Sequence, residues 1–141
     1  MTQIYFYSGC TDKLKTVCRL CVKAVQQEMK VMIYVPDKVL IDQLDELLWT
    51  FSATSFIPHC CRTDDGQMMN MTPVILSDRI QPDDCFDVLL NLHHQLPPSV
   101  NQFERLIEVA SVIPEDKLAA RERYRLYKNS GYEIQHYDLD E

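Results

Sequence analysis

Short apolar or aromatic runs with little polar alternation recur along the chain and predict strands buried between other layers. The first run ends at Gly9, where the glycine breaks it. Residues 104–110 (ERLIEVA) fit either a strand or a helix, and a strand is favoured. The other predicted strands are residues 3–8 (QIYFYS), 31–35 (VMIYV), 73–77 (PVILS), 87–92 (DVLLNL) and 132–137 (YEIQHY).

Two intervening segments carry apolar residues at three- and four-residue spacing, which predicts helices with one buried face. Thr11 or Asp12 can cap the first helix, which runs to about residue 29. The second helix begins at Asp37. Residues 55–59 (SFIPH) then predict a brief strand, and residues 61–71 a surface loop. The inward-facing residues predicted for the second helix are Val39, Leu40, Leu44, Leu47 and Leu48.

A third helix is predicted from Pro114 to the C-cap glycine Gly131. Glu115 and Asp116 occupy its first turn, where the helix dipole favours carboxylates. Strands and helices alternate along the chain, and parallel strands need such helical connections. The sequence therefore predicts an α/β fold with a mainly parallel central sheet, in a single domain that spans residues 1–141.

The composition is that of an acidic globular protein. The chain has 141 residues, is 46% hydrophobic and carries a formal net charge of −7, which disfavours general binding to nucleic-acid phosphates. No apolar run approaches the roughly 20 residues of a membrane span. The N-terminus shows no basic region followed by an apolar run, so a cytoplasmic location is expected.

The turn after the first strand lacks the glycines that a nucleotide site needs. Residues 8–15 (SGCTDKLK) hold one glycine, and the whole chain holds 3. A Rossmann fingerprint needs three glycines in this turn, and a P-loop needs two followed by lysine. Nucleotide binding through either motif is excluded, and no cofactor is predicted.

The cysteines permit a metal site by count, but their positions favour another role. Cys18 and Cys21 form a C-x-x-C pair, and His59, Cys60 and Cys61 add further possible zinc ligands. However, the C-x-x-C pair falls in the middle of a predicted helix, on its apolar face. Buried thiols are therefore favoured over metal or redox chemistry, and no metal is predicted.

Catalytic motifs are also lacking in the sequence. His93 and His94 follow a predicted strand, but no nucleophile accompanies them in a recognisable motif, so solvated loop histidines are favoured. The carboxylates of residues 44–48 (LDELL) are expected on an exposed helix face. The chain is predicted not to be an enzyme.

One short segment concentrates positive charge. Residues 117–128 hold five of the 14 Lys and Arg against one acid, Glu122. This gives the segment a charge of +4, while the other 9 cations and 20 acids give the rest of the chain −11. Guanidinium groups bind carboxylates in a two-pronged manner, and tyrosines beside them form an apolar wall, which suits an acidic peptide. A solvated basic face is the alternative. The predicted stripe is Lys117, Arg121, Tyr124, Arg125 and Lys128.

Two long motifs resemble the chi subunit family of bacterial DNA polymerase III. They are residues 44–59 (LDELLWTFSATSFIPH) and 119–139 (AARERYRLYKNSGYEIQHYDL), and residues 4–7 (IYFY), 18–24 (CRLCVKA) and 31–35 follow the same order as in that family. The resemblance implies a Rossmann-like three-layer fold without a nucleotide-binding motif. It also implies a non-enzymatic accessory subunit of the clamp-loader assembly.

The resemblance further implies two protein partners. The acidic C-terminal tail of single-stranded-DNA-binding protein would bind Arg121, Tyr124 and Arg125, with Lys117 one turn earlier and Lys128 attracting its acidic residues. DNA would be reached only through that partner, and no membrane is involved.

The second partner is psi, the subunit that joins chi to the clamp loader. It would contact Phe56, with Trp49 supporting or extending the surface. Without the resemblance, Phe56 is predicted to be an ordinary core residue. Two alternatives stay open. One is direct binding of single-stranded DNA by the cationic helix, and the other is a thiol or zinc protein that uses Cys18, Cys21, Cys60 and Cys61.

Overall fold

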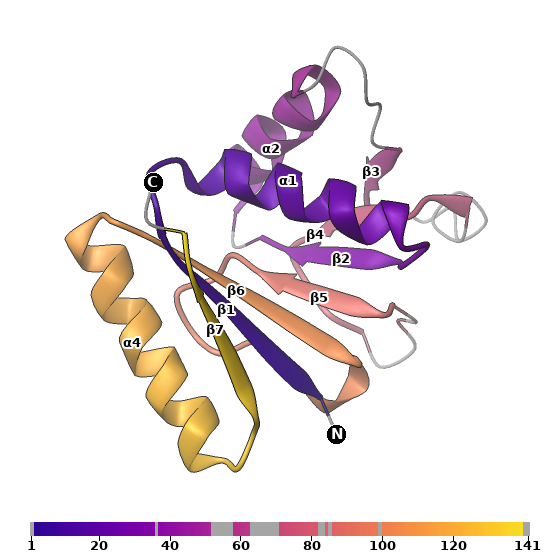
Figure 1. Cartoon of the computed structure of the whole chain (residues 1–141). Helices are drawn as coiled ribbons and strands as arrows, with labels where there is room; N and C mark the ends of the chain where they lie inside the picture. Colours follow the sequence, from indigo (N-terminus) through magenta and orange to yellow (C-terminus); the bar gives the residue numbers. More distant parts are fainter. Residues whose placement is uncertain are drawn as a thin grey trace.

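The structure is a computed structural model that describes residues 2–35, 37–51, 58–62, 71–81, 84, 86–98 and 100–139 (Figure 1). Strands and helices alternate along most of this part of the chain. In order, the elements are β1 (Gln3–Cys10), α1 (Lys13–Gln26), β2 (Val31–Tyr34), α2 (Lys38–Thr50), β3 (His59–Cys61), β4 (Val74–Ser77), β5 (Val88–Asn91), the short 3-10 helix η1 (Val100–Gln102), β6 (Arg105–Ser111), α4 (Pro114–Asn129) and β7 (Ile134–Asp138).

The seven strands form one sheet in the order β3-β4-β2-β5-β6-β1-β7, and every neighbouring pair is parallel. Alternate strand residues point to opposite faces. Val31 and Ile33 pack in the cluster that contains α1 and α2, whereas Met32 packs in the cluster that contains α4. Both faces are apolar, as expected of a parallel sheet with helices on each side. The predicted α/β, Rossmann-like layered fold is confirmed.

Most predicted elements occur where the sequence places them, including the strand choice for residues 104–110. The Asp12 side chain accepts a hydrogen bond from Lys15 N at 3.1 Å, and Asp37 accepts one from Leu40 N at 2.8 Å. Both are therefore N-caps. Within the described ranges, no helix combines the length and apolarity that crossing a membrane requires.

One prediction about the first half of the chain needs correction, and another is only partly tested. Val39 is 68% exposed, although Leu48 is buried. Nine residues amount to about two and a half helical turns, so these two side chains point in opposite directions. The strand predicted over residues 55–59 falls partly outside the described residues, and the strand in this region begins at His59.

A buried polar network fastens α4 to the sheet. Glu108, on β6, is fully buried and accepts hydrogen bonds from Arg123 Nε at 2.9 Å, Tyr127 Oη at 2.7 Å and Asn91 Nδ2 at 2.9 Å. Arg123 also donates to the carbonyl oxygen of His94 at 2.9 Å. Arg123 is only 2% exposed, so this one of the five cations of residues 117–128 faces inward and adds no charge to the surface.

Opposing effects act on the pKa of the Glu108 carboxyl in this network. Burial raises the pKa of the Glu108 carboxyl, while Arg123 and the hydrogen bonds from Asn91 and Tyr127 oppose that rise. Burial, together with the neighbouring Glu108 charge, raises the pKa of Tyr127, so its hydroxyl stays a hydrogen-bond donor. Removing one partner would therefore leave the others desolvated and unsatisfied.

Asp116 fixes the start of α4. Its carboxylate accepts hydrogen bonds from Lys13 Nζ at 2.8 Å, and from Ser111 N and Oγ at 2.7 and 2.9 Å. Burial alone would raise the pKa of Asp116, but these hydrogen bonds and the Lys13 charge lower it below its usual value. The first turn of α4 is thus tied to the end of β6 and to α1.

We expect Arg123→Met to lower the free energy of unfolding by about 3–5 kcal/mol, because it strands the Glu108 charge in the interior. Adding Glu108→Gln removes that charge and keeps an acceptor for Asn91 and Tyr127. The double variant should therefore regain at least about 1 kcal/mol. Urea unfolding measures both, with the exposed Arg125→Met as control. Equal stability of the single and double variants would contradict the ion-pair assignment.

Asp116→Asn should cost about 1–3 kcal/mol of unfolding free energy at neutral pH. A carboxyl whose pKa is lowered by folding stabilises above its unfolded pKa, and that stabilisation is lost as pH falls through the folded pKa. The difference between the variant and the parent should therefore shrink below about pH 4. Urea titrations at stepwise lower pH test this, and a difference independent of pH would refute it.

Candidate functional site

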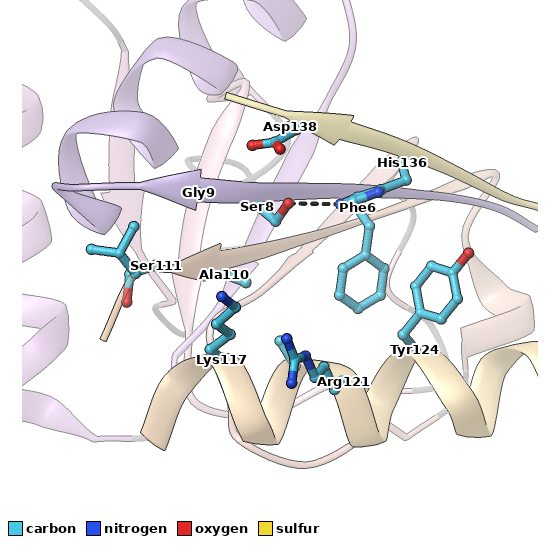
Figure 2. Close-up of a pocket in the computed structure, with 12 residues that line it drawn as sticks. Phe6, Ser8, Gly9, Ala110, Ser111, Lys117, Arg121, Tyr124, His136 and Asp138 are labelled. Carbon is cyan, nitrogen blue, oxygen red and sulfur yellow. Dashed lines mark hydrogen bonds between the residues drawn. The ribbon is translucent and has the colours of Figure 1, made fainter. Parts of the chain in front are cut away.

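A cavity of about 410 Å³ lies between α4 and the strands β1, β6 and β7. Its floor is apolar, with Phe6 from β1, Ala110 from β6 and Ala120 from α4. Lys117 and Arg121 stand at its rim and are exposed. Figure 2 shows both side chains rising from α4 toward the strands. The volume is within the range of ordinary ligand pockets.

Helical spacing places the α4 residues of this cavity in one stripe. Ala120 and Arg121 come three and four residues after Lys117, and Tyr124 comes four and three residues after them. Ala120 is 4% exposed, so the small side chain lies against the sheet while the two cations beside it reach the solvent. The anchoring of Arg123 on the adjacent, buried stripe sets this rotation of α4.

Aromatic contacts hold Tyr124 in position. Its ring meets the ring of Phe6 edge to face, with centroids 5.3 Å apart at 71°, and it lies 6.3 Å from the ring of His136. The ammonium of Lys128 lies 5.8 Å from the centroid of the Tyr124 ring, within cation–π range. Tyr124 therefore forms an ordered wall between the apolar floor and a second cation.

A bulge in β1 shapes the opposite wall. The register with β6 shifts between Tyr7 and Cys10, and Gly9 has a φ of +80°, in the region that favours glycine. The sequence predicts that Gly9 ends the first strand. In the structure, β1 instead continues through Gly9 to Cys10, with an irregular step in its pairing. Ser8, beside it, lies 2.6 Å from His136 Nε2, which links β1 to β7 across the cavity wall.

The five residues predicted to bind a peptide divide into three groups. Lys117, Arg121 and Tyr124 line the cavity, and Lys128 reaches the edge of the Tyr124 ring. Arg125 is exposed and pairs with Glu122, outside the lining. The cavity thus combines an apolar floor with a cationic rim, an arrangement that can hold an apolar group attached to a carboxylate.

Sequence reasoning missed the strand residues of this cavity. Phe6 and Ser8 on β1, Ala110 on β6 and His136 on β7 all point to the face covered by α4. Period-two alternation assigns Phe6 and Ser8 to one face. The pairing of β1 with β6 and β7, which brings the other residues beside them, carries no local signal.

The predicted surface around Trp49 and Phe56 is only partly described. Trp49, on α2, is 57% exposed, and its ring meets the ring of His59 edge to face at 5.0 Å. His59 Nε2 lies 2.9 Å from the Asp45 carboxylate, so this carboxylate of the predicted exposed face contacts a histidine of β3. Phe56 lies outside the described residues.

The C-x-x-C pair is buried in α1, as predicted. Cys18 and Cys21 are both inaccessible, and burial raises the pKa of Cys18 to about 12 and also raises that of Cys21. Both are neutral thiols at physiological pH. Among the described residues, no group of three or more His, Cys, Asp or Glu side chains is placed to hold a metal ion.

The prediction that both histidines after β5 are solvated is wrong for one of them. His94 is exposed, but the ring of His93 stacks on that of Tyr34, with centroids 5.5 Å apart at 18°. The Asn91 side chain fixes this turn by accepting a hydrogen bond from His93 N at 3.0 Å.

Solved structures share the fold at low sequence identity. A mutant of S. cerevisiae Dbp5 bound to RNA and ADP BeF3 aligns with a TM-score of 0.63 and 11% identity, over 99% of this chain and 42% of that one. The Pyrococcus furiosus Hef helicase domain aligns with a TM-score of 0.55 and 12% identity, over 99% of this chain and 36% of that one. This chain spans less than half the length of either, and the likeness concerns the fold alone.

Sequence relatives cover the chain much more closely. DNA polymerase III subunit chi of Pseudomonas aeruginosa is 33% identical over an alignment of 143 positions, which covers 99% of this chain and 98% of that protein. The Escherichia coli protein of the same name is 25% identical over 118 residues, 84% of this chain and 80% of that one. The family model described as "DNA polymerase III chi subunit, HolC" matches residues 1–135. This chain therefore belongs to the DNA polymerase III chi subunit family and is an accessory, non-catalytic subunit of that polymerase assembly.

Proposed function

We propose that this chain is a replication adaptor. In the cavity between α4 and β1, β6 and β7 it binds the acidic C-terminal tail of single-stranded-DNA-binding protein, and through psi it joins that protein to the clamp loader. The observation that carries the tail assignment is the apolar floor of Phe6, Ala110 and Ala120 beneath the cationic rim of Lys117 and Arg121.

A peptide's chain end matches this arrangement in chemistry and in order. The terminal carboxylate and the last side chain of a peptide share one Cα atom, so a site for both must place a cation beside an apolar hollow. Arg121 pairs with the carboxylate in two-pronged fashion, while Phe6 and Tyr124 receive the apolar side chain. Lys117 and Lys128 attract the acidic residues that precede the last residue of the peptide.

The affinity of one tail is modest, because the rim is exposed. Solvent-exposed ion pairs contribute less than about 1 kcal/mol each, and physiological salt screens them over about 8 Å. The apolar hollow supplies the part of the binding that resists salt. A multimeric partner on DNA presents several tails together, which raises the effective affinity without new contacts.

Arg121→Ala should weaken binding of the tail peptide about tenfold, because the substitution removes the guanidinium next to the apolar hollow. Arg125→Ala is the matched control: this residue is one turn away, carries the same charge and pairs with Glu122 outside the cavity. It should change affinity by less than about threefold. Fluorescence anisotropy with a labelled tail peptide measures both variants.

A peptide amidated at its C-terminus separates carboxylate recognition from general charge attraction. It should bind the parent protein more weakly than the free acid and should lose little further affinity with Arg121→Ala. Equal binding of the free acid to the parent and to Arg121→Ala would remove the cavity from consideration. Equal losses of peptide affinity in Arg121→Ala and Arg125→Ala would show that net charge, and not the cavity, accounts for the effect.

The second partner contact is proposed for the end of α2. Trp49 exposes 57% of its surface there, and Phe56 follows it in the sequence. Exposed tryptophan is unusually common at the energetic centres of protein interfaces. This surface is separate from the cavity, whose residues come from β1, β6, α4 and β7, so one subunit can hold both partners.

Trp49→Ala and Phe56→Ala should each weaken psi binding by at least about tenfold, as expected for aromatic anchors of an interface. Val39→Ala is the control, since Val39 is an exposed apolar residue on the same helix. Calorimetric titration with purified psi reports the loss, and unfolding curves of the variants exclude misfolding. Normal psi binding by both aromatic variants would place that contact elsewhere.

A further inference from the structure

A second row of cations runs along α1. This helix contains Lys13, Lys15, Arg19 and Lys23 and no carboxylate between Lys13 and Gln26. Lys15, Arg19 and Lys23 are exposed and recur at four-residue steps, so they share one side of the helix. Like charges at this spacing weaken a helix, so folding of the helix does not account for the row.

Tyrosines cover the sheet face next to this helix. Tyr7 on β1 pairs in register with Tyr137 on β7, and their rings stack with centroids 5.0 Å apart at 17°. Tyr137 is 42% exposed. The hydroxyls of Tyr5 and Tyr137 donate hydrogen bonds to the amide oxygens of Gln3 and Gln135, at 2.7 and 2.8 Å. Neutral groups therefore hold two of these rings in place.

Lys23, the last cation of this row, shares a hollow with two of the tyrosines. A cavity of about 110 Å³ is lined by Tyr5 and Tyr7, by Lys23 from α1 and by Arg105 from β6. The Arg105 guanidinium lies 5.7 Å from the centroid of the Tyr5 ring, in cation–π range. Figure 1 shows β1 and β7 extending away from α1 at the border of the sheet. This hollow is on the face opposite to α4, because odd-numbered residues of β1 point away from that helix.

We propose that α1 and the adjoining tyrosines form a binding surface for single-stranded nucleic acid. This surface comprises Lys15, Arg19 and Lys23 on α1, together with Tyr5, Tyr7, Arg105 and Tyr137 on the sheet. The cations meet the phosphates, and the exposed tyrosine ring stacks on a base. Rings beside arginine and lysine on an open sheet are the combination that single strands bind without sequence preference.

The surroundings favour this occupant over two others. A duplex keeps its bases stacked on each other, so its base faces cannot reach the tyrosines, and the net charge of −7 repels its dense phosphates. An acidic peptide would pair with Lys15, Arg19 and Lys23 but would leave the stacked rings of Tyr7 and Tyr137 unused. Only unpaired nucleotides carry a negative charge and a flat aromatic face in every repeating unit.

The test uses the full chain and a fluorescein-labelled oligo(dT), with anisotropy measured at low salt. The combined variant Lys15→Glu, Arg19→Glu and Lys23→Glu should weaken binding at least about tenfold and flatten the salt dependence by about 0.7 in log–log slope per lost phosphate contact. Tyr137→Ala should weaken binding about fivefold without changing that slope. Circular dichroism checks that each variant is folded.

Two controls locate the effect. Lys38→Glu, an exposed cation on α2, and the pair Lys117→Glu and Arg121→Glu on α4 should each change oligo(dT) affinity by less than about threefold. The α4 pair should meanwhile abolish binding of the tail peptide, so failure of this proposal and failure of the tail assignment are distinguishable. The α1 variant should keep its affinity for the tail peptide.

Several outcomes overturn the proposal. These are the absence of oligo(dT) binding at low salt, an unchanged affinity in Tyr137→Ala, and a larger loss from the α4 pair than from the α1 variant. Equal affinity for a duplex, or displacement of oligo(dT) by a glutamate-rich peptide at the same concentration, would assign the surface to another partner.

Discussion

The position of α4 depends on a buried ion pair. Glu108 and Arg123 meet beneath the helix with almost no exposure, and Tyr127 and Asn91 complete the set of hydrogen bonds. Such a pair gains little net stability over apolar side chains, but displacing one partner leaves an uncompensated charge in the interior. With Arg123 turned inward, helical geometry turns Lys117, Arg121 and Tyr124 toward the cavity. The same pair therefore selects the rotation of the helix and the chemistry of the surface it presents.

Local signals in the sequence were sufficient for most of the fold. Asp12 and Asp37 cap their helices, and Gly131, with a φ of +88°, ends α4, because each acts on neighbours within a few residues. The cavity depends on distant partners instead. Arg123 cannot be told from the exposed cations around it until Glu108, 15 residues earlier on a strand, is found beneath it. The floor residue Phe6 comes from the opposite end of the chain to Tyr124.

A single glycine shows how a widespread fold is adapted. In the nucleotide-binding motifs of such folds, glycines after the first strand bring backbone amides close to phosphate. Here the segment predicted to form that turn, residues 8–15, has one glycine, and the structure places this glycine within β1. Gly9 takes a positive φ where the register with β6 shifts, and it lines the cavity next to Ser8, which lies beside His136. The irregularity in β1 therefore shapes a pocket on the sheet face under α4, to the side of the turn itself.

Charge alone does not specify a partner, and the two cationic helices illustrate why. Both α1 and α4 carry exposed lysine and arginine on an acidic protein, and they cover opposite faces of the sheet. Around Lys117 and Arg121 the neutral surface is concave and apolar, which fits a chain end that carries one carboxylate. Around Lys23 and Arg105 it consists of the rings of Tyr5 and Tyr7, with the exposed Tyr137 stacked on Tyr7, which fits a polyanion with a flat base in each unit. Since long-range attraction is the same for both ligands, discrimination must arise after contact, from the uncharged residues between the cations.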